Sequence, residues 1–408
     1  MLDKDNIFFK KKILIYGLGK SGLSAYRFLK KDNKIYLYDD DKIKNQNLEI
    51  KKKLIQYQDV IHEKIDCIII SPGIDIKKCK LKNFLKKNLG KIHTDLDIFY
   101  YYNKKNKNIT ITGTNGKSTT VKIIYEVLKC QKIDARLVGN IGNPILSEKK
   151  ITPKTVFVIE ASSYQLEYSK IFKSHLAAIL NISPDHLERH GSIRNYIKAK
   201  FKLIKTQTKK DFTFLNKNNL FIKRYLSGQK ILSKIIKINK TVQSKVLKKI
   251  DNPNFLSDGN KENLSFVFEI AKKMKISKNN LFKVLQKFNG LDFRQQVIFK
   301  SKNLIIINDS KATSFSSTVS ILRSITNVYW IVGGQAKKGD KFLLNKSECK
   351  NIEAYIFGKN KKFFINKLKK KINYQLFDDL KSSIKKILID VKKNNKKQHI
   401  ILFSPAAA

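Results

Sequence analysis

The sequence predicts an α/β protein of three domains, each built around a largely parallel β-sheet. Its 408 residues are more than one hydrophobic core normally holds. Short β-branched runs alternate with helical patterns along the chain, which is the order of elements that produces parallel sheets. Two of these runs lead directly into glycine-rich turns. We place the domains at residues 1–96, 97–291 and 292–408.

The composition fits a globular protein and excludes several other classes. Hydrophobic residues make up 42% of the chain, and no apolar run approaches the roughly 20 residues of a membrane span. The N-terminus lacks the apolar core of a signal peptide. The four cysteines, Cys67, Cys79, Cys130 and Cys349, have no metal-binding spacing and indicate reduced thiols. We therefore expect a cytoplasmic monomer that does not insert into membranes.

The formal net charge of +51 is of the kind found in nucleic-acid-binding proteins. Arginine supplies few of the 84 basic residues, and the lysines are spread evenly among many Ile and Asn residues. Proteins that read nucleic acids tend to use Arg, with stacking aromatic residues gathered in one region. An AT-rich genome would impose the same Lys, Ile and Asn excess on any protein. We therefore predict no nucleic-acid partner.

The first domain opens with a strand, residues 12–16, that runs into the complete G-x-G-x-x-G turn Gly17–Gly22. A helical pattern follows, and the next strand, residues 34–38, ends at Asp39. Three interpretations stay open from these residues alone. The turn could bind a nicotinamide dinucleotide with Asp39 on its ribose, it could bind another nucleotide diphosphate, or it could be purely structural.

The second domain carries the most informative pattern of the chain. A β-branched strand breaks into Gly113-Thr-Asn-Gly-Lys-Ser118, and a helical pattern follows. The two glycines allow a tight turn that points backbone N–H groups at an anion. Lys117 can reach the outer phosphates of a nucleotide, and the Ser118 hydroxyl can ligate Mg²⁺. Ile111 replaces the first glycine of the longer phosphate-loop pattern, and a chance strand–turn–helix is the alternative.

Two later strands of this domain end in side chains suited to a metal ion or a substrate. Glu160 follows the strand 155–159, and a carboxylate at this edge of a parallel sheet is a natural Mg²⁺ ligand. His186 follows the strand 177–182 and would hold a second metal or touch substrate. The alternatives are a solvated Glu and a structural His. In a chain so rich in Lys, Lys200 is not distinguished by composition.

The third domain presents polar residues after two of its strands. Asn308–Thr313 follows the strand 304–307, and Gly333–Lys337 follows the strand 328–332. Two such strand ends with Lys and hydroxyl or backbone donors would bind an anionic small molecule. Two ordinary strand-to-helix turns are the alternative.

Taken together, these motifs resemble those of the Mur ligase family, and the resemblance covers the whole chain. Gly259 and Phe293 depart from it, because His is usual at both positions. Asn308–Thr313 is the most specific of the resembling strings, since family members that add other amino acids have different sequences there. The strings are Gly113–Thr119, Glu160–Leu166, Asn181–His186, Gly259–Asn263, Phe288–Arg294 and Asn308–Thr313.

The resemblance implies an ATP-dependent ligase of peptidoglycan synthesis that joins D-glutamate to UDP-N-acetylmuramoyl-L-alanine. ATP would phosphorylate the alanyl carboxylate, and the amine of D-glutamate would attack the acyl phosphate. The implied fold has a Rossmann-like N-terminal domain for UDP, a central ATPase-type domain and a C-terminal Rossmann-like domain for the amino acid. The implied cofactors are ATP and Mg²⁺. A carbamylated Lys200 is also implied, because CO₂ turns this cation into a carboxylate that ligates Mg²⁺.

The resemblance also implies a role for each site residue. The residues implied to act in catalysis are Lys117, Lys200, His186 and Lys311. Those implied to bind ATP are Gly113, Thr114, Asn115, Gly116, Lys117, Ser118, Thr119, Asn260, Asn263, Arg294 and Asp309. Those implied to bind the UDP substrate are Leu18, Gly19, Lys20, Ser21, Asp39, Gly73, Asn140 and His186. Lys311, Thr313 and Lys337 would bind D-glutamate. Ser118, Glu160, His186 and carbamylated Lys200 would ligate the metal.

The sequence departs from the family pattern at two points, and three other functions stay open. Asp41 stands where family members often have Arg, so we expect different uracil contacts. Family members also continue past Ser404–Ala408 with residues that complete the D-glutamate pocket, so we expect a truncated chain with weak D-glutamate binding and low turnover. The alternative functions are another amino-acid ligase of this family, a nicotinamide-dependent dehydrogenase and a phosphate-loop ATPase acting on nucleic acid.

Overall fold

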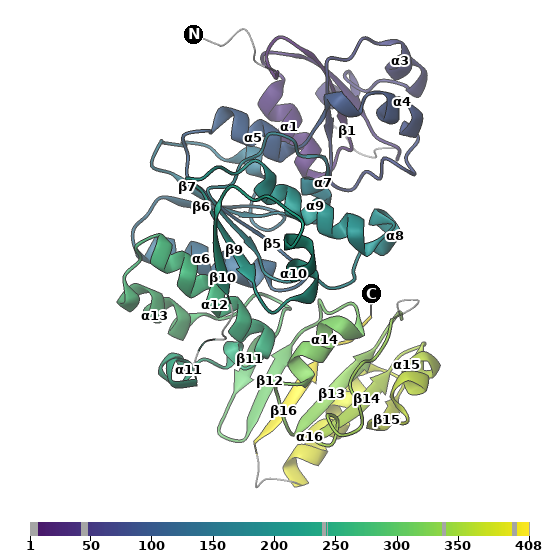
Figure 1. Cartoon of the computed structure of the whole chain (residues 1–408). Helices are drawn as coiled ribbons and strands as arrows, with labels where there is room; N and C mark the ends of the chain where they lie inside the picture. The colour runs from purple at the N-terminus through teal and green to yellow at the C-terminus, as the bar shows by residue number, and fades with distance from the viewer. Residues whose placement is uncertain are drawn as a thin grey trace. The chain divides into compact units, whose positions relative to one another are not determined.

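The computed structural model describes residues 7–41, 48–238, 242, 244–336, 340–393 and 398–407 (Figure 1). The chain forms two compact units, residues 1–239 and 240–408. Two β-sheets lie in the first unit and a third lies in the second, with helices between most successive strands. The predicted α/β class with largely parallel sheets is therefore confirmed.

The first sheet has the strand order β2-β1-β3-β4, and all its strands are parallel. Its central strands are buried on both faces, which is why they are continuous apolar runs. The predicted strands at 12–16 and 34–38 are confirmed. The strands are β1 (Lys12–Tyr16), β2 (Lys34–Tyr38), β3 (Cys67–Ile70) and β4 (Ile92–His93). The helices are α1 (Lys20–Leu29), α2 (Leu48–Lys51), α3 (Tyr57–His62), α4 (Lys82–Lys87) and the 3₁₀ helix η1 (Leu89–Lys91).

The second sheet has the strand order β10-β9-β8-β5-β7-β6 and is also fully parallel. Its strands are β5 (Asn108–Thr112), β6 (Ala135–Gly139), β7 (Val156–Glu160), β8 (Leu176–Ile179), β9 (Phe212–Asn216) and β10 (Lys234–Ile238). The helices of this region are α5 (Asp95–Tyr102), α6 (Lys117–Cys130), η2 (Ile145–Ser147), α7 (Ser163–Tyr168), α8 (Leu187–His190), α9 (Ile193–Lys205) and α10 (Leu220–Leu226).

The predicted strand bounds in this region differ from the observed ones by one to three residues: β7 is Val156–Glu160 and not 155–159, and β8 is Leu176–Ile179 and not 177–182. Strand β8 was expected to reach residue 182, but it ends at Ile179. The physical reason is that the Asn181 carbonyl accepts a hydrogen bond from the Thr114 N–H of the neighbouring loop and not from a strand. The expected division at residues 96 and 97 falls inside helix α5.

The third sheet has the strand order β11-β12-β16-β13-β14-β15, and only β11 runs antiparallel to its neighbour. Its strands are β11 (Gln296–Lys300), β12 (Leu304–Asn308), β13 (Val328–Gly333), β14 (Ile352–Phe357), β15 (Asn373–Phe377) and β16 (His399–Phe403). The helices of this unit are α11 (Ser244–Ile250), η3 (Pro253–Phe255), α12 (Asp258–Lys273), α13 (Lys278–Lys287), α14 (Phe315–Leu322), α15 (Lys361–Leu368) and α16 (Leu380–Lys393).

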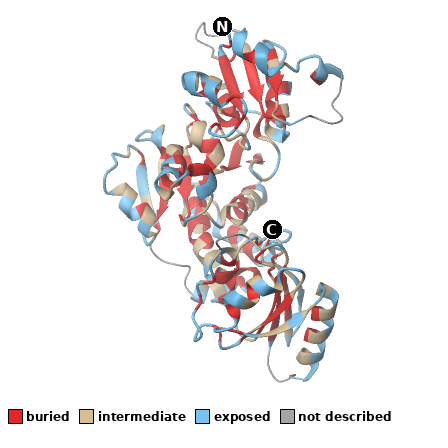
Figure 2. Ribbon diagram, turned by 90° about the vertical axis from the view of Figure 1, so that its right-hand side faces the viewer, coloured by how far each residue is buried: buried red, intermediate tan, exposed pale blue. Residues whose placement is uncertain are grey.

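Buried residues are concentrated in the strands of the three sheets (Figure 2). The third sheet has a core on each face: one contains Phe315 and Trp330, and the other contains Tyr355 and Ile387. The Trp330 indole donates a hydrogen bond of 2.8 Å to the Ser404 carbonyl, so its polar atom is satisfied inside this core. Within the part of the chain that the structure describes, no helix has the length and apolar composition of a membrane span.

Asp97 fastens helix α5 to the segment that follows α7. Its Oδ1 accepts hydrogen bonds from the Ser169 hydroxyl at 2.8 Å and from the backbone N–H groups of residues 170–172 at 2.9 to 3.1 Å. Burial opposes the charge of this carboxylate, but the nearby His93, together with hydrogen bonds from the backbone and Ser169, holds its pKa below the ordinary value. One side chain thus fixes four donors of a segment more than 70 residues away in sequence.

Candidate active site

The segment from β5 to α6 forms the predicted strand, turn and helix. Gly116 precedes the helix with φ +83°, in the left-handed region that favours glycine. Gly113 has φ +156°, and a Cβ there would lie 3.1 Å from the Leu180 Cβ. The turn is therefore closed by glycines at two tight positions, and the 14-residue helix α6 directs its N-terminus at the space above the loop.

The loop is held in place by the end of β8 and by helix α9. The Thr114 N–H donates to the Asn181 carbonyl at 2.9 Å, and the Asn115 N–H donates to the Asn181 Oδ1 at the same distance. The Thr114 hydroxyl lies 3.1 Å from the Tyr196 hydroxyl and accepts a hydrogen bond from the Ser183 N–H. The sequence did not single out Tyr196. The one feature that could have indicated it is its position one helical turn before Lys200, which places both side chains on the same face of α9.

Lys117 folds back over the loop. Its ammonium donates to the Gly113 and Thr114 carbonyls at 2.9 and 2.8 Å. Ser118 and Thr119 follow in the first turn of α6, where helix N–H groups have no partner within the helix. This arrangement places a cation, a hydroxyl and free N–H groups at one point, which suits the phosphates of a nucleotide.

Lys200 lies beneath the same loop and is 1% exposed. Its Nζ donates to the Gly113 carbonyl at 2.8 Å and lies 4.5 Å from the centre of the Tyr196 ring. Burial, and after it the charge of Lys117, lowers the pKa of Lys200 well below the ordinary lysine value. Composition did not distinguish this lysine, although the family resemblance implied a role for it, and its burial separates it from the solvated lysines.

Glu160 ends strand β7 and is 1% exposed. Its Oε1 accepts a hydrogen bond of 2.7 Å from the Asn140 side chain, while its buried Oε2 has no hydrogen-bond partner. Gly139 makes this approach possible, because a Cβ at that position would lie 2.4 Å from the Glu160 carbonyl oxygen. The two residues predicted for metal and for substrate, Glu160 and Asn140, are thus in direct contact.

These side chains fit a Mg²⁺ ion that is shared with a nucleotide. The orphaned Glu160 Oε2 is a buried anionic oxygen of the kind that cations require. Among the described residues, no group of three or more His, Cys, Asp or Glu side chains is placed to hold a metal by itself. The ion would therefore depend on the Ser118 hydroxyl, on nucleotide phosphates and on a modified Lys200.

His186 does not join this group in the structure. It has a left-handed backbone (φ +53°), and its side chain is 42% exposed beside Asp185 and Glu188. Its ring centre lies 5.0 Å from that of Tyr164. Within the described residues, no hydrogen bond or ion pair joins His186 to Ser118, Glu160 or Lys200. Its predicted roles in catalysis, metal ligation and substrate binding stay predictions.

A second histidine, which no sequence motif indicated, is buried one turn further along. His190 Nε2 lies 3.0 Å from the Ser163 hydroxyl, and its ring stacks on Tyr164. Burial, followed by the charge of Arg189, lowers the pKa of His190 to about 4. His190 is therefore neutral near pH 7 and fixes Ser163, which begins α7 directly after the Glu160 strand end. No sequence signal separated it from His186.

The first glycine turn forms a second nucleotide-type loop at the end of β1. A Cβ on Gly22 would lie 1.9 Å from the Gly17 carbonyl, so α1 packs on the turn at a distance that only glycine permits. The Leu18 N–H donates to Asp39 Oδ2 at 2.6 Å, which ties the ends of β1 and β2 together. The predicted Gly19, Lys20 and Gly73 are exposed, and Ser21 is half-buried.

In the second unit, Asp309 is the buried centre of the predicted site. Its Oδ1 accepts from the Gln295 N–H at 3.1 Å, and its Oδ2 accepts from the Ser404 hydroxyl at 2.8 Å. Burial raises the pKa of Asp309 to about 7, despite these hydrogen bonds and the nearby Arg294. Lys311 is exposed, with its ammonium 5.4 Å from the centre of the Phe293 ring.

The remaining predicted residues of this unit are placed as follows. Thr313 and Arg294 are exposed. Asn260 donates to the Asn254 carbonyl at 2.7 Å, and the buried Asn263 donates to Asn260 Oδ1 at 3.3 Å. Lys337 lies outside the described residues.

Comparisons with known proteins identify relatives of the chain. Residues 111–281 match the family model of the Mur ligase middle domain, and residues 11–92 match that of the Mur ligase MurD-like N-terminal domain. The chain is 30% identical to a UDP-N-acetylmuramoylalanine--D-glutamate ligase of Rickettsia bellii, with 98% of this chain and 93% of that protein covered. It is 34% identical to the protein of the same name from Francisella tularensis subsp. novicida, with 97% and 91% covered.

Solved structures show the same fold. The MurF ligase of Thermotoga maritima in complex with ADP matches with a TM-score of 0.54 at 13% identity, covering 98% of this chain and 95% of that one. The UDP-N-acetylmuramate-alanine ligase MurC of Thermotoga maritima matches with a TM-score of 0.53 at 16% identity, covering 98% and 96%.

Proposed function

The chain belongs to the Mur ligase family, and we propose that it joins D-glutamate to UDP-N-acetylmuramoyl-L-alanine with cleavage of ATP, as a step of peptidoglycan synthesis. The observation that carries this proposal is the loop Gly113–Thr119, which lies directly over the buried Lys200. The relatives from Rickettsia and Francisella support the choice of D-glutamate, because both carry that activity in their names and match over nearly the whole chain.

The first step would transfer a phosphoryl group. The substrate's alanyl carboxylate attacks the γ-phosphorus of ATP, so that an acyl phosphate forms and ADP leaves. The N–H groups of the loop and the Lys117 ammonium would bind the phosphates and neutralise the charge that moves during the transfer. The Lys117 ammonium already lies at the loop, where it donates hydrogen bonds to two backbone carbonyls. Phosphate oxygens would replace these carbonyls as acceptors when ATP binds.

The second step would form the amide bond. The amine of D-glutamate attacks the acyl carbon and loses a proton, and inorganic phosphate departs with the electron pair of the broken C–O bond. Lys311, Thr313 and Lys337 would bind the two carboxylates of D-glutamate. Exposed cations at a strand end are suited to this task, and Lys311 and Thr313 are both exposed.

Mg²⁺, when bound, supplies charge neutralisation to the phosphates of ATP. Ser118, Glu160 and a carbamylated Lys200 would hold it, and His186 would contribute if its side chain turns toward them. The burial of Lys200 favours its modification, because a neutral amine reacts with CO₂. Asn140 would then position Glu160 through the 2.7 Å hydrogen bond and contact the muramoyl part of the substrate.

The first glycine turn would bind the UDP part of the substrate. Leu18 and Gly19 precede α1, and Lys20 and Ser21 begin it. The N-terminus of this helix favours a diphosphate. Asp39 and Gly73 would lie toward the uracil. Asp39 already accepts the Leu18 N–H, so it would orient the loop as well as contact the base. With ATP, UDP-substrate and amino acid as its partners, we propose a monomeric enzyme of the cytoplasm with three domains at 1–96, 97–291 and 292–408.

A phosphate-release assay tests this function. The full chain with ATP, Mg²⁺ and UDP-N-acetylmuramoyl-L-alanine should release phosphate when D-glutamate is added, and much less with L-glutamate, L-alanine or a diamino acid. The Lys117→Met variant is the background control, because it keeps the side-chain length and removes the charge. Release that depends on another amino acid would assign a different ligase activity. Release stimulated by DNA or RNA without the UDP substrate would overturn the proposal.

A further inference from the structure

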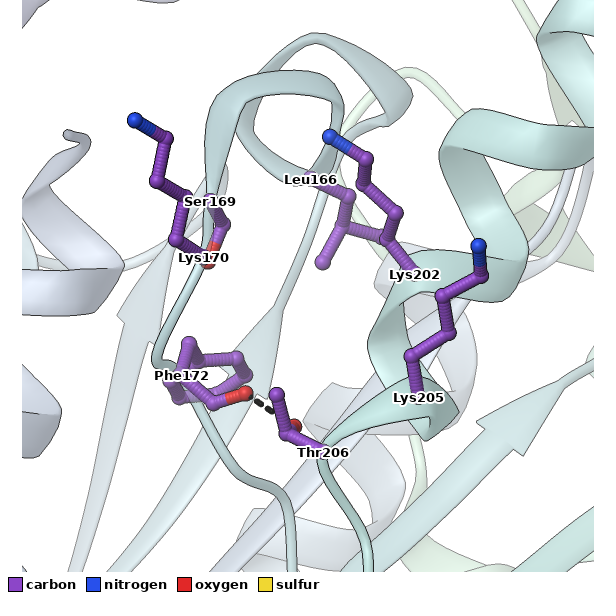
Figure 3. A pocket seen from close by; sticks show the side chains of 7 residues that line it. All are labelled: Leu166, Ser169, Lys170, Phe172, Lys202, Lys205 and Thr206. Carbon is purple, nitrogen blue, oxygen red and sulfur yellow. Dashed lines mark hydrogen bonds between the residues drawn. The ribbon is translucent and has the colours of Figure 1, made fainter. Parts of the chain in front are cut away.

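A cavity of about 250 Å³ lies between the end of α7 and the last turn of α9. None of its lining residues belongs to the candidate active site. Two buried apolar side chains, Leu166 and Phe172, line it together with three lysines, and no carboxylate does (Figure 3). A small cavity with an apolar wall and a net charge of one sign is a candidate ligand site.

The apolar wall is fixed in place by hydrogen bonds. The Thr206 hydroxyl donates to the Phe172 carbonyl, and the Phe172 N–H donates to Asp97 Oδ1 at 3.1 Å. Leu166 and Phe172 are 1% and 2% exposed. The wall is therefore formed before any ligand enters, which lowers the entropic cost of binding.

The three lysines that line the cavity do not use all of their hydrogen-bond donors within the described residues. An ammonium carries three donors. Lys170 uses two of them on the Leu89 and Gly90 carbonyls, at 2.6 and 2.7 Å, and Lys202 uses one on the Glu167 carbonyl. Within the described part of the chain, the Lys205 ammonium makes no hydrogen bond, and none of the three lysines forms an ion pair.

Two acids lie beside this group, Asp97 and Glu167, and both are directed elsewhere. Asp97 Oδ1 accepts hydrogen bonds from the Ser169 hydroxyl and from backbone N–H groups. The Glu167 carboxylate lies 3.8 Å from Arg189 Nε and 3.8 Å from His190 Nδ1, so only its backbone carbonyl serves Lys202. Figure 3 shows the three lysine nitrogens on one side of the cavity and the Phe172 ring and Thr206 on the other. Three cations that form no ion pair within the described residues, opposite an apolar wall, match an anion that carries an apolar group.

We propose that this cavity binds a small organic phosphate of the aryl or acyl class. Its phosphate would lie among Lys170, Lys202 and Lys205, and its apolar part would rest on Leu166 and Phe172. A dianionic phosphate matches three cations better than a single carboxylate does. The inference goes beyond the ligase function and does not rest on it.

Calorimetric titration of the full chain with phenyl phosphate tests the proposal. We expect saturable binding that Lys170→Met and Lys205→Met each weaken by about tenfold or more, because a charge-assisted hydrogen bond is worth at least that factor. Lys170→Arg should retain binding. Lys198→Met is the matched control: it removes an exposed lysine of the same helix that does not line the cavity. Lys117→Ala, which damages the ATP loop, should bind as the native chain does.

Two comparison ligands separate the parts of the site. Inorganic phosphate, which lacks the apolar group, and benzyl alcohol, which lacks the charge, should both bind more weakly than phenyl phosphate. The proposal would be overturned if phenyl phosphate showed no saturable binding up to about 10 mM, or if inorganic phosphate bound as tightly as phenyl phosphate. It would also be overturned if Lys198→Met weakened binding as much as the cavity variants do, or if Lys117→Ala abolished binding. Circular dichroism of every variant confirms that it is folded.

Discussion

The side-chain nitrogen of Lys200 lies 2.8 Å from the backbone oxygen of Gly113, directly beneath the ATP loop. A lysine that is 1% exposed without a carboxylate bonded to it is costly to keep charged. Its place under the loop is explained if it becomes an anion by addition of CO₂, since it then supplies an oxygen ligand next to the loop's Ser118.

Replacement of Lys200 by alanine should lower the ligase rate by about 100-fold or more, the scale of a lost electrostatic group in an active site. Added formate or acetate should restore part of the rate, because a free carboxylate can take the place of the carbamate. Lys198→Ala on the exposed side of α9 is the control and should keep the native rate. Native activity of Lys200→Ala without a carboxylate would remove this residue from the mechanism.

Replacement of Glu160 by glutamine tests the metal site separately. The amide keeps the shape and one acceptor for Asn140, but it removes the negative charge of the orphaned Oε2. We expect the rate to fall by about 100-fold and the Mg²⁺ concentration for half-maximal activity to rise. Glu126→Gln, on the partly exposed part of α6, is a matched control. An unchanged Mg²⁺ dependence in Glu160→Gln would show that Glu160 is not a ligand.

Replacement of Asp97 by alanine should destabilise the first unit by about 3 kcal/mol or more, because several buried donors lose their acceptor at once. Hydrogen exchange measures the effect locally: the amides of residues 170–172 should exchange much faster. Asp59→Ala removes an exposed carboxylate and should leave these amides protected. Unchanged protection in Asp97→Ala would contradict the role of this contact.

The stability of the second unit should depend on pH through Asp309. Its pKa is raised to about 7 in the folded state, against about 4 in an unfolded chain. The folded state binds more protons between these values, so the free energy of unfolding should fall by up to about 4 kcal/mol as pH rises from about 4 to about 7. Trp330, the only tryptophan of the chain, reports unfolding of this unit by fluorescence.

Asp309→Asn should flatten this pH dependence, because the amide still accepts hydrogen bonds but cannot titrate. The control is Asp378→Asn, whose native side chain is 96% exposed. The comparison is made by urea unfolding at pH 5 and pH 8. An equal difference between the two pH values in native protein and in Asp309→Asn would show that Asp309 does not contribute.

Sequence periodicity was sufficient for the architecture, because buried parallel strands need continuous apolar runs and their crossovers need helices. The strands 12–16 and 34–38 were predicted to the residue. The glycines at 113 and 116 were predicted for the same kind of reason: a phosphate turn needs backbone conformations that few other residues adopt. The family motifs then gave the ligase activity, which no local pattern contains.

The tertiary structure decided which of many similar side chains matter. Lys200 differs from its neighbour Lys198 only in the direction it takes from α9, one beneath the loop and the other into solvent. The same holds for His190, which is buried, and His186, which is not. Two sets of hydrogen bonds join segments that are far apart in sequence: Asn140 with Glu160, and Asp97 with the backbone of residues 170–172. Burial and long-range contact set these environments, and the residue types alone do not encode either.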